Sequence, residues 1–429
     1  MNKDKNIVYA AILGAGTVGG GVIKLAESMK EDIQNKTGAE LVIKKILVRN
    51  LNKKRPGVDE SVLTDDFTSI INDPEIDIVI ELMGGIEPAK TYVVQALEAG
   101  KQVVTANKDL LAEHGKEVMD AADKTGCDLQ FEAAVAGAIP IIRPLKQSMA
   151  GNKINEIMGI VNGTTNYILT KMTELGMSYE DALAKATELG YAEADPTADV
   201  EGYDAGRKMA IMASIGFNSR VTFSDVYTEG ITRITAEDIK YAEEFGYVIK
   251  LLGVAKNTED GIEVKVHPML INEDHPLATV RNSFNAVFVH GEAMDDAMFM
   301  GRGAGEMPTA SAVMGDVVDV MRDLVHNCCG RIGCSCYRNL QVKKIDETKS
   351  KFFLRIQAVD RPGVLANIAS VLGNNDVSIA QVVQKSRKSG NAELVIITDE
   401  VEEKNFNDAM KVFDGMSVVQ EISGVIRVY

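Results

Sequence analysis

The sequence predicts a multidomain α/β protein whose first domain is built on a doubly wound parallel sheet. Three observations support this fold class. A glycine-rich loop, GAGTVGGG, joins a strand-like run to a helical pattern, β-branched runs then alternate with further helical patterns, and residues 352–428 have a strand and helix order of their own. A chain of 429 residues with 45% apolar residues is long enough for about two or three ordinary hydrophobic cores.

The glycine-rich loop lies where a predicted strand turns into a predicted helix. Residues 7–13 read as a buried strand, and the helical pattern after Gly19 runs to about Lys36. In that position Gly14 permits a tight turn, Gly16 lets the backbone approach a pyrophosphate, and Gly19 lets helix and strand pack closely. A simple strand-to-helix turn would show the same glycines, so the loop alone leaves both interpretations open.

The runs that follow the loop favour a dinucleotide-binding domain of the Rossmann type. LVIKKILV, DIVIEL and QVVTA are β-branched and are separated by helical patterns. Arg49 stands at the tip of the second strand, where an NAD-specific protein would carry an acid, so we expect NADP, with NAD as a possible cofactor. A solvated basic turn is the alternative. The contacts expected from this region are Gly14, Gly16, Thr17, Val18, Gly19 and Arg49.

Net charge and hydropathy narrow the class of partner. A formal net charge of −16 argues against sequence-blind binding to nucleic acid or acidic lipid, because such binding needs a cationic surface. The apolar runs are short and broken by charge, and the amino terminus MNKDKN leads into a strand-like segment rather than a signal-peptide core. We therefore expect a cytoplasmic protein that acts on a small molecule, without a nucleic-acid or membrane partner.

Four of the five cysteines, Cys328, Cys329, Cys334 and Cys336, fall within the segment NCCGRIGCSC. A metal site, a set of disulfides and a reduced linker are the three interpretations. Structural zinc sites usually have two C-x(2–4)-C pairs separated by about a dozen or more residues, which this segment lacks. A reduced linker without a ligand is therefore favoured.

Two segments in the middle of the chain carry candidate chemistry. A glycine-rich, nearly charge-free stretch at 133–142 follows Glu132 and could present several oxygen ligands to a hard monovalent cation. Further on, Asp204 and Lys208 lie one turn apart on a predicted helix. Such a pair is most often exposed, whereas burial would make the lysine a tunable proton donor.

Seven segments together resemble homoserine dehydrogenases. In chain order they are GAGTVGGGV, VIELMGG, VVTANKDLLA, EAAVAGAIPII, GIVNGTTNYIL, LGYAEADPTADVEGYDAGRK and GRGAGEMPTASAV, and they cover nearly all of residues 7–325. The resemblance implies NAD(P)-linked interconversion of L-homoserine and L-aspartate 4-semialdehyde in threonine and methionine biosynthesis. It also implies a homodimer or a homotetramer.

The resemblance further implies roles for individual residues. Lys208 would be the proton donor, Lys108 would lie at the junction of cofactor and substrate, and Glu193 and Asp204 would bind substrate. Hydride transfer to an aldehyde leaves an alkoxide, which a lysine can both stabilise and protonate, while Glu193 would bind the substrate's ammonium group. The other implied contacts are Thr105 and Gly303 for the cofactor, and Glu132 with the carbonyls of Val135, Gly137 and Ile139 for a monovalent cation, expected to be Na⁺.

Residues 352–428 predict a separate carboxyl-terminal module. The order strand, helix, strand, strand, helix, strand is the split βαβ pattern. The loop VDRPGVL resembles that of ACT domains, which bind amino acids, and implies effector contacts from Asp360, Gly363 and Val364, with threonine as the expected effector. We expect the module to fold by itself, so that a chain ending near Asn327 keeps its catalytic core.

The sequence thus predicts three domains and a linker. They are a dinucleotide-binding domain at 1–136, on which a helix at about 305–327 packs back, an α+β substrate-binding and dimerisation domain at 137–304, a linker at 328–350 and the ACT-like module at 351–429. A non-catalytic sensor of amino acid and nucleotide is the alternative function, since fold alone does not separate the two. The presence of Lys108, Glu193, Asp204 and Lys208 together favours the enzyme.

Overall fold

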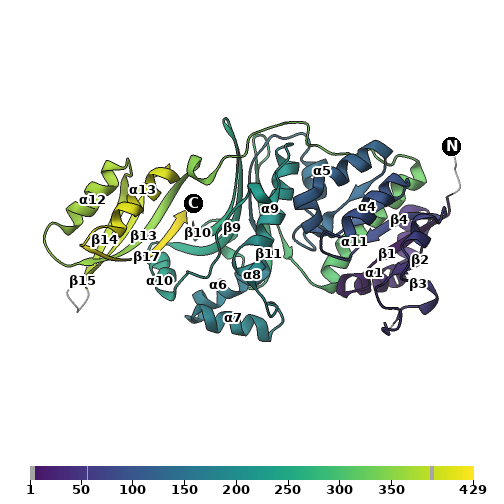
Figure 1. The fold of residues 1–429 in the computed structure, drawn as a ribbon, viewed down its shortest axis with the longest axis horizontal. Coiled ribbons are helices and arrows are strands. Elements are labelled where there is room, and N and C mark those ends of the chain that lie inside the picture. Colours follow the sequence, from purple (N-terminus) through teal and green to yellow (C-terminus); the bar gives the residue numbers. More distant parts are fainter. Residues whose placement is uncertain (1–4, 56, 387–390) are drawn as a thin grey trace. The chain divides into compact units, whose positions relative to one another are not determined.

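The computed structural model describes residues 5–55, 57–386 and 391–429 (Figure 1). They form two compact units. Unit 1 comprises Met1–Ile157, Arg207–Ser224 and Asn285–Leu340, and unit 2 comprises Met158–Gly206, Asp225–Phe284 and Gln341–Tyr429. Strand β7 (Ile154–Ile160) and helix α9 (Tyr203–Gly216) each run from one unit into the other. The predicted domain boundaries remain predictions.

Unit 1 contains a six-stranded parallel sheet in the order β3-β2-β1-β4-β5-β6. This is the doubly wound order, whose direction reverses between β1 and β4, and it confirms the predicted fold class. The carboxyl ends of those two strands therefore form the crevice in which such sheets bind a dinucleotide. The strands are β1 (Ile7–Leu13), β2 (Glu40–Leu47), β3 (Leu63–Thr64), β4 (Ile76–Glu81), β5 (Gln102–Thr105) and β6 (Leu129–Gln130).

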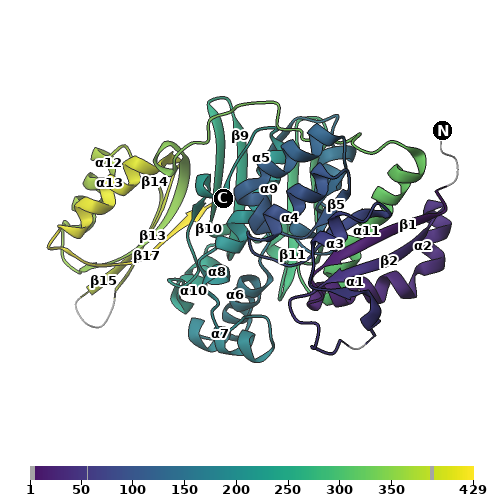
Figure 2. The same cartoon turned by 45° about the vertical axis from the view of Figure 1, so that its right-hand side comes forward.

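Helices pack on both faces of this sheet and bury its strands. On one face α1 packs against α11, and apolar side chains such as Val22 and Val317 share a core with Val8 and Ile12 of β1 (Figure 2). Helices α4 and α5 pack against each other. The helices of unit 1 are α1 (Thr17–Ser28), α2 (Lys30–Thr37), α3 (Thr68–Ile71), α4 (Ala89–Glu98), α5 (Lys108–Thr125) and α11 (Glu306–His326).

The helix predicted after the glycine loop is two helices. Met29, between α1 and α2, leaves helical geometry with φ −107° and ψ 15°. Neither glycine nor proline stands at this break, so the sequence pattern does not signal it. Helix α2 ends at Gly38, whose φ of 81° lies in the left-handed region that favours glycine at a helix end.

Unit 2 begins with helices and continues into a long antiparallel hairpin. Strands β9 (Tyr247–Thr258) and β10 (Gly261–Asn272) pair along their full length around a tight turn. The other elements before the carboxyl-terminal module are α6 (Gly163–Leu175), α7 (Tyr179–Glu188), α8 (Thr197–Val200), β8 (Tyr227–Thr228) and α10 (Ala236–Glu244). Strands β11 (Phe284–Gly291) and β12 (Asp295–Arg302) follow the hairpin, and unit 1 contains nearly all of this strand pair.

The carboxyl-terminal module has the predicted strand and helix order, with one additional short strand, β16. Its sheet order is β17-β13-β15-β14, and all neighbours in this order are antiparallel. Phe352, Leu354 and Ile356 of β13 point to one face, where they form a core with α12 and α13. The elements are β13 (Lys349–Val359), α12 (Val364–Asn374), β14 (Ile379–Ser386), β15 (Asn391–Thr398), β16 (Val401–Glu402), α13 (Glu403–Asp414) and β17 (Val419–Val428).

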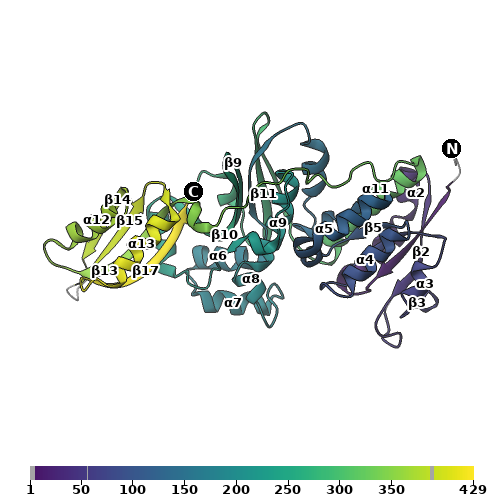
Figure 3. The ribbon, with the colours of Figure 1, turned by 45° about the horizontal axis from the view of Figure 1, so that its top comes forward.

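The carboxyl-terminal module makes direct contacts with the rest of unit 2, which the sequence does not indicate. The end of β17 pairs in parallel with β10, so the module's sheet continues into the hairpin (Figure 3). On the second face of β13, Arg355 is buried and bonds to Asp238 of α10, and Phe353 lies edge-on to Phe245 just beyond that helix. A chain ending near Asn327 would uncover β10 and leave Asp238 without its cation.

The described parts of the chain contain no candidate membrane-spanning helix. None of the helices there combines the length with the apolar composition that a bilayer span requires.

Candidate active site

The glycine-rich loop has the local geometry of a phosphate cradle. Gly14 has a φ of 102°, and a Cβ there would come within 2.9 Å of the Leu82 carbonyl oxygen. A Cβ at Gly19 would come within 2.2 Å of the Gly14 oxygen, so this glycine allows the close packing of helix on strand. A Cβ at Gly16 would meet none of the described atoms within 4 Å. Glycine at positions 14 and 19 is therefore required by the packing of the loop, whereas position 16 faces open space.

The remaining cofactor residues predicted from the first two strands lie around this crevice. Thr17 is exposed and Val18 is half-buried at the start of α1, whose amino terminus has no side-chain cap. Its free N–H groups can therefore donate hydrogen bonds to an anion. Arg49 is exposed two residues after β2 ends.

A buried carboxylate that the sequence analysis did not single out holds the ends of β4 and β5. Glu81 accepts hydrogen bonds from the Thr105 hydroxyl at 2.6 Å and from the Met83 amide at 2.8 Å, and burial raises the pKa of its carboxyl group. The Thr105 hydroxyl in turn accepts from the Asn107 amide at 3.0 Å. The Thr105 hydroxyl thus has two protein partners, and its geometry is that of a positioning residue. The sequence signal that could have identified Glu81 is the position of an acidic residue at the end of an apolar strand.

The start of α5 is fixed beside α9 in unit 1. Asn107 caps α5 by accepting from the Leu110 amide at 3.0 Å, which leaves half-buried Lys108 as the first helical residue. The neighbouring Asp109 forms an ion pair with Arg207 of α9, with 3.0 Å between Oδ1 and Nε. Since Arg207 precedes Lys208, this ion pair holds the two helix segments that carry the predicted catalytic lysines next to each other.

Both members of the acid and lysine pair on α9 are buried. Asp204 is 7% exposed and Lys208 is 8% exposed, which excludes the alternative of an ordinary surface ion pair. In unit 2, Asn162 donates from Nδ2 to Asp204 at 2.9 Å and to Asp199 at 2.6 Å, and it also caps α6. Asn162 belongs to the GIVNGTT segment, but its role depends on a contact across 42 residues that the sequence does not reveal.

Glu193 is the predicted substrate residue with the most open surroundings. It is exposed, and it lies in the loop between α7 and α8 of unit 2. Unit 2 also contains Asp204, whereas Lys108 and Lys208 belong to unit 1. The structure therefore groups the predicted residues as two lysines in one unit and two carboxylates in the other, joined through α9.

The predicted cation loop is organised around the Glu132 carboxylate. Its Oε1 accepts from the amides of Ile141 at 2.6 Å and Ile142 at 2.7 Å, and its Oε2 accepts from the Arg143 amide at 2.8 Å. Three backbone donors thus surround this buried side chain. In the described residues no cluster of three or more His, Cys, Asp or Glu side chains could hold a metal ion.

Main-chain carbonyls are the remaining predicted cation ligands in this loop. Within the described ranges, no backbone N–H donates to the carbonyl oxygen of Val135, Gly137 or Ile139, and all three residues are buried. Gly137 has a φ of 56°, and a Cβ there would come within 2.4 Å of the Gly303 oxygen. The loop therefore packs directly on the predicted cofactor-covering glycine segment, and its donor-free carbonyls fit a hard monovalent cation.

A second buried acid missed by the sequence analysis supports the same loop from α11. Asp316 accepts from the Glu132 amide at 2.8 Å and from Arg143 Nη2 at 2.6 Å. Burial, reinforced by the neighbouring Glu132 charge, raises the pKa of Asp316 to about 7. An aspartate within the apolar face of a predicted helix was the only sequence signal.

The three predicted effector residues line one hollow in the carboxyl-terminal module. Asp360, Gly363 and Val364 surround a space of about 770 Å³, together with residues of β14 and β15. Gly363 has a φ of 89° and precedes α12, so the start of that helix, which has no side-chain cap, lines the same hollow as Asp360. A carboxylate close to a helix amino terminus offers partners for an ammonium and a carboxylate group at once.

Comparisons with known proteins agree with the resemblance inferred from the motifs. A family model described as the NAD-binding domain of homoserine dehydrogenase matches residues 14–132, one described as homoserine dehydrogenase matches 140–318, and an ACT domain model matches 352–414. The homoserine dehydrogenase of Bacillus subtilis is 43% identical over 98% of both chains, and that of Corynebacterium glutamicum is 46% identical over 98% of this chain and 95% of its own.

Solved structures give the same result for the fold. A homoserine dehydrogenase from Thiobacillus denitrificans superposes with a TM-score of 0.92 at 41% identity, covering 99% of this chain and 98% of its own. A hyperthermophilic archaeal homoserine dehydrogenase in complex with NADPH covers 73% of this chain and 97% of its own, with a TM-score of 0.62 and 26% identity.

Proposed function

Because the chain belongs to the homoserine dehydrogenase family, an oxidoreductase family, we propose that it interconverts L-homoserine and L-aspartate 4-semialdehyde with NADP, in threonine and methionine biosynthesis. The observation that carries the proposal is the burial of Lys208, one helical turn after the equally buried Asp204. A lysine held on a buried helix face can stand at a fixed position beside a reacting oxygen, as a proton donor requires.

In this mechanism the nicotinamide, when bound, supplies or accepts the hydride. Lys208 stabilises the negative charge that forms on the aldehyde oxygen and delivers a proton to it, and in the oxidation direction it takes the proton from the hydroxyl group. Asp204 orients the substrate, with Asn162 fixing its carboxylate. Glu193 binds the substrate ammonium group, and Lys108 lies between substrate and cofactor.

The open space at Gly16 and the uncapped amino terminus of α1 support binding of a dinucleotide pyrophosphate. NADP rather than NAD is favoured by Arg49, an exposed cation just after β2, the strand whose tip usually contacts the ribose. The archaeal relative solved with NADPH is in agreement. Gly303 covers the bound cofactor in this proposal.

A monovalent cation, Na⁺, completes the proposed site. The carbonyls of Val135, Gly137 and Ile139 would hold it, since no described backbone amide donates to them and the Glu132 carboxylate is already engaged by three amides. The ion's role would be to stiffen the loop beneath Gly303.

The carboxyl-terminal module senses an amino acid, threonine, in the hollow at Asp360. The carboxylate of Asp360 matches the ammonium group of an amino acid, and the start of α12 matches its carboxylate. Buried charges connect the module with the rest of unit 2, because Arg355 bonds to α10 and Arg427 bonds to Glu229 at 2.7 Å. The protein would act in the cytoplasm as a homodimer or homotetramer.

Absorbance of the reduced cofactor tests this proposal directly. Purified protein with L-homoserine should reduce NADP⁺, and NAD⁺ less efficiently, with turnover that depends on both substrates. Absence of turnover with either cofactor, in buffers with and without Na⁺, would favour the non-catalytic sensor instead.

A further inference from the structure

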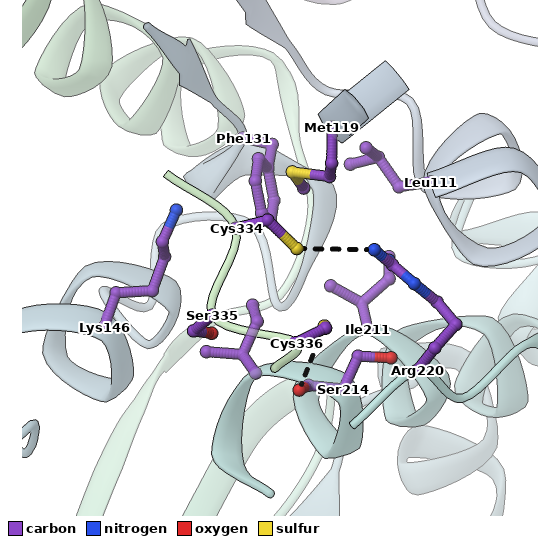
Figure 4. A pocket seen from close by; sticks show the side chains of 11 residues that line it. Leu111, Met119, Phe131, Lys146, Ile211, Ser214, Arg220, Cys334, Ser335 and Cys336 are labelled. Atoms are coloured by element: carbon purple, nitrogen blue, oxygen red, sulfur yellow. Dashed lines mark hydrogen bonds between the residues drawn. The ribbon is translucent and has the colours of Figure 1, made fainter. Parts of the chain in front are cut away.

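We propose that Cys334 and Cys336 form a thiol redox site that reacts with low-molecular-weight disulfides and closes to an intrachain disulfide that lowers turnover. The two sulfurs lie in a pocket of unit 1, with an empty volume of about 390 Å³ (Figure 4). The effect on turnover rests on the proposed enzymatic function, whereas the thiol chemistry does not.

Arg220 contacts the Cys334 sulfur, and Asp123 contacts the Cys334 backbone. Arg220 Nη2 donates to Cys334 Sγ at 3.4 Å, and the half-buried Lys146, whose Nζ donates to the Ile332 carbonyl at 3.4 Å, lines the same pocket (Figure 4). Asp123 of α5 accepts from the Cys334 amide at 3.2 Å. The adjacent Cys336 thiol, helped by the Arg220 guanidinium, lowers the pKa of the Cys334 thiol below its ordinary value, while the same contact and burial raise the pKa of Cys336, so Cys334 is the sulfur of the pair that ionises first.

The other cysteines near the linker lack this environment. Cys328 is bonded to Asp323 Oδ1 at 3.2 Å, and burial together with that carboxylate raises the pKa of its thiol. Burial and the charge of Asp128 raise the pKa of Cys329 to about 12. Both therefore remain protonated and unreactive, which makes them internal controls for Cys334.

Access and reach both permit the reaction. Cys334 and Cys336 are each partly exposed, so a small disulfide can reach the first sulfur. Cα atoms two residues apart are separated by at most about 7 Å, close to the range that a disulfide spans. The Tyr337 amide bonds to the Ser335 carbonyl at 2.9 Å, so the chain already turns at this point.

The chemistry is a two-step exchange. The Cys334 thiolate attacks one sulfur of a low-molecular-weight disulfide, RSSR, and the S–S bond breaks with release of RS⁻. The Cys336 thiol then loses its proton, and its sulfur attacks Cys334 and releases the second RS⁻. Both thiolates take up protons, so the two cysteine thiols are oxidised to one disulfide while RSSR is reduced to two RSH.

The pocket walls connect this site with the predicted catalytic lysines. Ile211, Ser214 and Ile215 belong to α9, which carries Lys208, and the other wall includes α5, which begins at Lys108. Cys336 Sγ bonds to the Ser214 carbonyl at 3.6 Å. Closing the disulfide removes the thiol proton that makes this contact, so the change at Cys336 acts directly on α9.

The segment that follows is fastened to the end of the same helix. The amides of Arg338 and Leu340 bond to the Asn218 carbonyl at 2.8 Å and to the Ser219 hydroxyl at 2.9 Å. These hydrogen bonds restrain the residues after Cys336, so a conformational change at residues 334–336 affects α9 instead of being taken up by an unrestrained linker.

Alkylation with iodoacetamide tests the thiolate. At about pH 6 an ordinary thiol is only ~0.3% ionised, whereas the lowered pKa of Cys334 gives it a larger thiolate fraction, so Cys334 should be alkylated faster than the other cysteines. Peptide mass mapping should find Cys334 labelled first in the full-length protein and in Cys328→Ser. First labelling at another cysteine would overturn the proposal.

Titration with glutathione disulfide tests the disulfide and its effect. Mass mapping should find a Cys334 to Cys336 bond, and Cys336→Ser should instead accumulate a glutathione adduct on Cys334. Because a displacement of about 1 Å in a site can cost about 100-fold, we expect homoserine turnover to fall at least about tenfold and to recover with dithiothreitol. Cys334→Ser should be resistant and Cys328→Ser should behave like the unchanged protein.

The two readouts separate the possible failures. Another pairing, or no bond, overturns the redox site whatever the enzyme does. Formation of the predicted bond with unchanged turnover overturns the link to α9. A protein that forms the bond but never oxidises homoserine contradicts the proposed function and leaves the thiol chemistry standing.

Discussion

Replacing Arg355 with methionine should destabilise unit 2 strongly, because its guanidinium group is the cation for several acids between α10 and the carboxyl-terminal module. Arg355 is 2% exposed, and its nitrogens lie 2.9 Å from Asp238 and 3.0 Å from Glu393, whose side chains are 1% and 2% exposed. Removing one partner of a buried ion pair costs about 3–5 kcal/mol, because the remaining charge stays buried. We expect a loss of this size in the free energy of unfolding.

Lys385→Met is the matched control. Lys385 of β14 pairs with Glu244 of α10 at 2.6 Å, so it joins the module to the same helix, but both side chains are 42% exposed. An exposed pair contributes about 0–1 kcal/mol. Since the chain has no tryptophan, urea unfolding is best followed by far-UV circular dichroism. Equal stability of the two variants, or a loss below about 1 kcal/mol for Arg355→Met, would refute the reasoning.

Three further predictions follow from individual side chains. Arg49→Ala should weaken NADP⁺ by about 1–3 kcal/mol and NAD⁺ much less, and equal weakening in a binding titration would mean that this turn is only solvated surface. Asp360→Asn should raise the threonine concentration for half-inhibition at least about tenfold, whereas exposed Asp376→Asn should not, and retained inhibition would remove Asp360 from the effector site. Burial lowers the pKa of Lys250 to about 8, while an unfolded lysine titrates near ~10.4, so the unfolded chain binds more protons between these values. The free energy of unfolding should therefore gain a rising contribution from about pH 8 to 10, and Lys250→Met should lose it, which parallel urea titrations would detect as a difference in slope.

The doubly wound fold class of the first domain could be predicted because each of the signals that indicate it is local. Apolar β-branched runs, helical patterns between them and glycines at a turn all lie within a few residues of one another. The break at Met29 carries no such signal, and it depends on how α2 packs under β2 rather than on any residue at the break.

The hydrogen-bond partners of the buried acids could not be predicted because those partners are distant in sequence. Glu132 and Asp316 meet across 184 residues, and Asn162 and Asp204 meet across 42. The pairing of β17 with β10 could not be predicted for the same reason. The predicted elements of the module form a complete split βαβ unit, and nothing in them indicates that β17 has another neighbouring strand. The resemblance of the motifs predicts which residues carry chemistry, and only the fold shows which contacts hold those residues in place.

The role of Lys208 is best tested by the turnover of Lys208→Ala with L-homoserine and NADP⁺, measured together with the dissociation constant for NADPH. Loss of a positioned proton donor should lower kcat by about 100-fold or more, and cofactor affinity should stay nearly unchanged. Lys185→Ala, which removes an exposed lysine of α7, serves as the control and should keep normal turnover. Near-normal kcat in Lys208→Ala would contradict proton transfer by Lys208 and would leave Lys108 as the candidate.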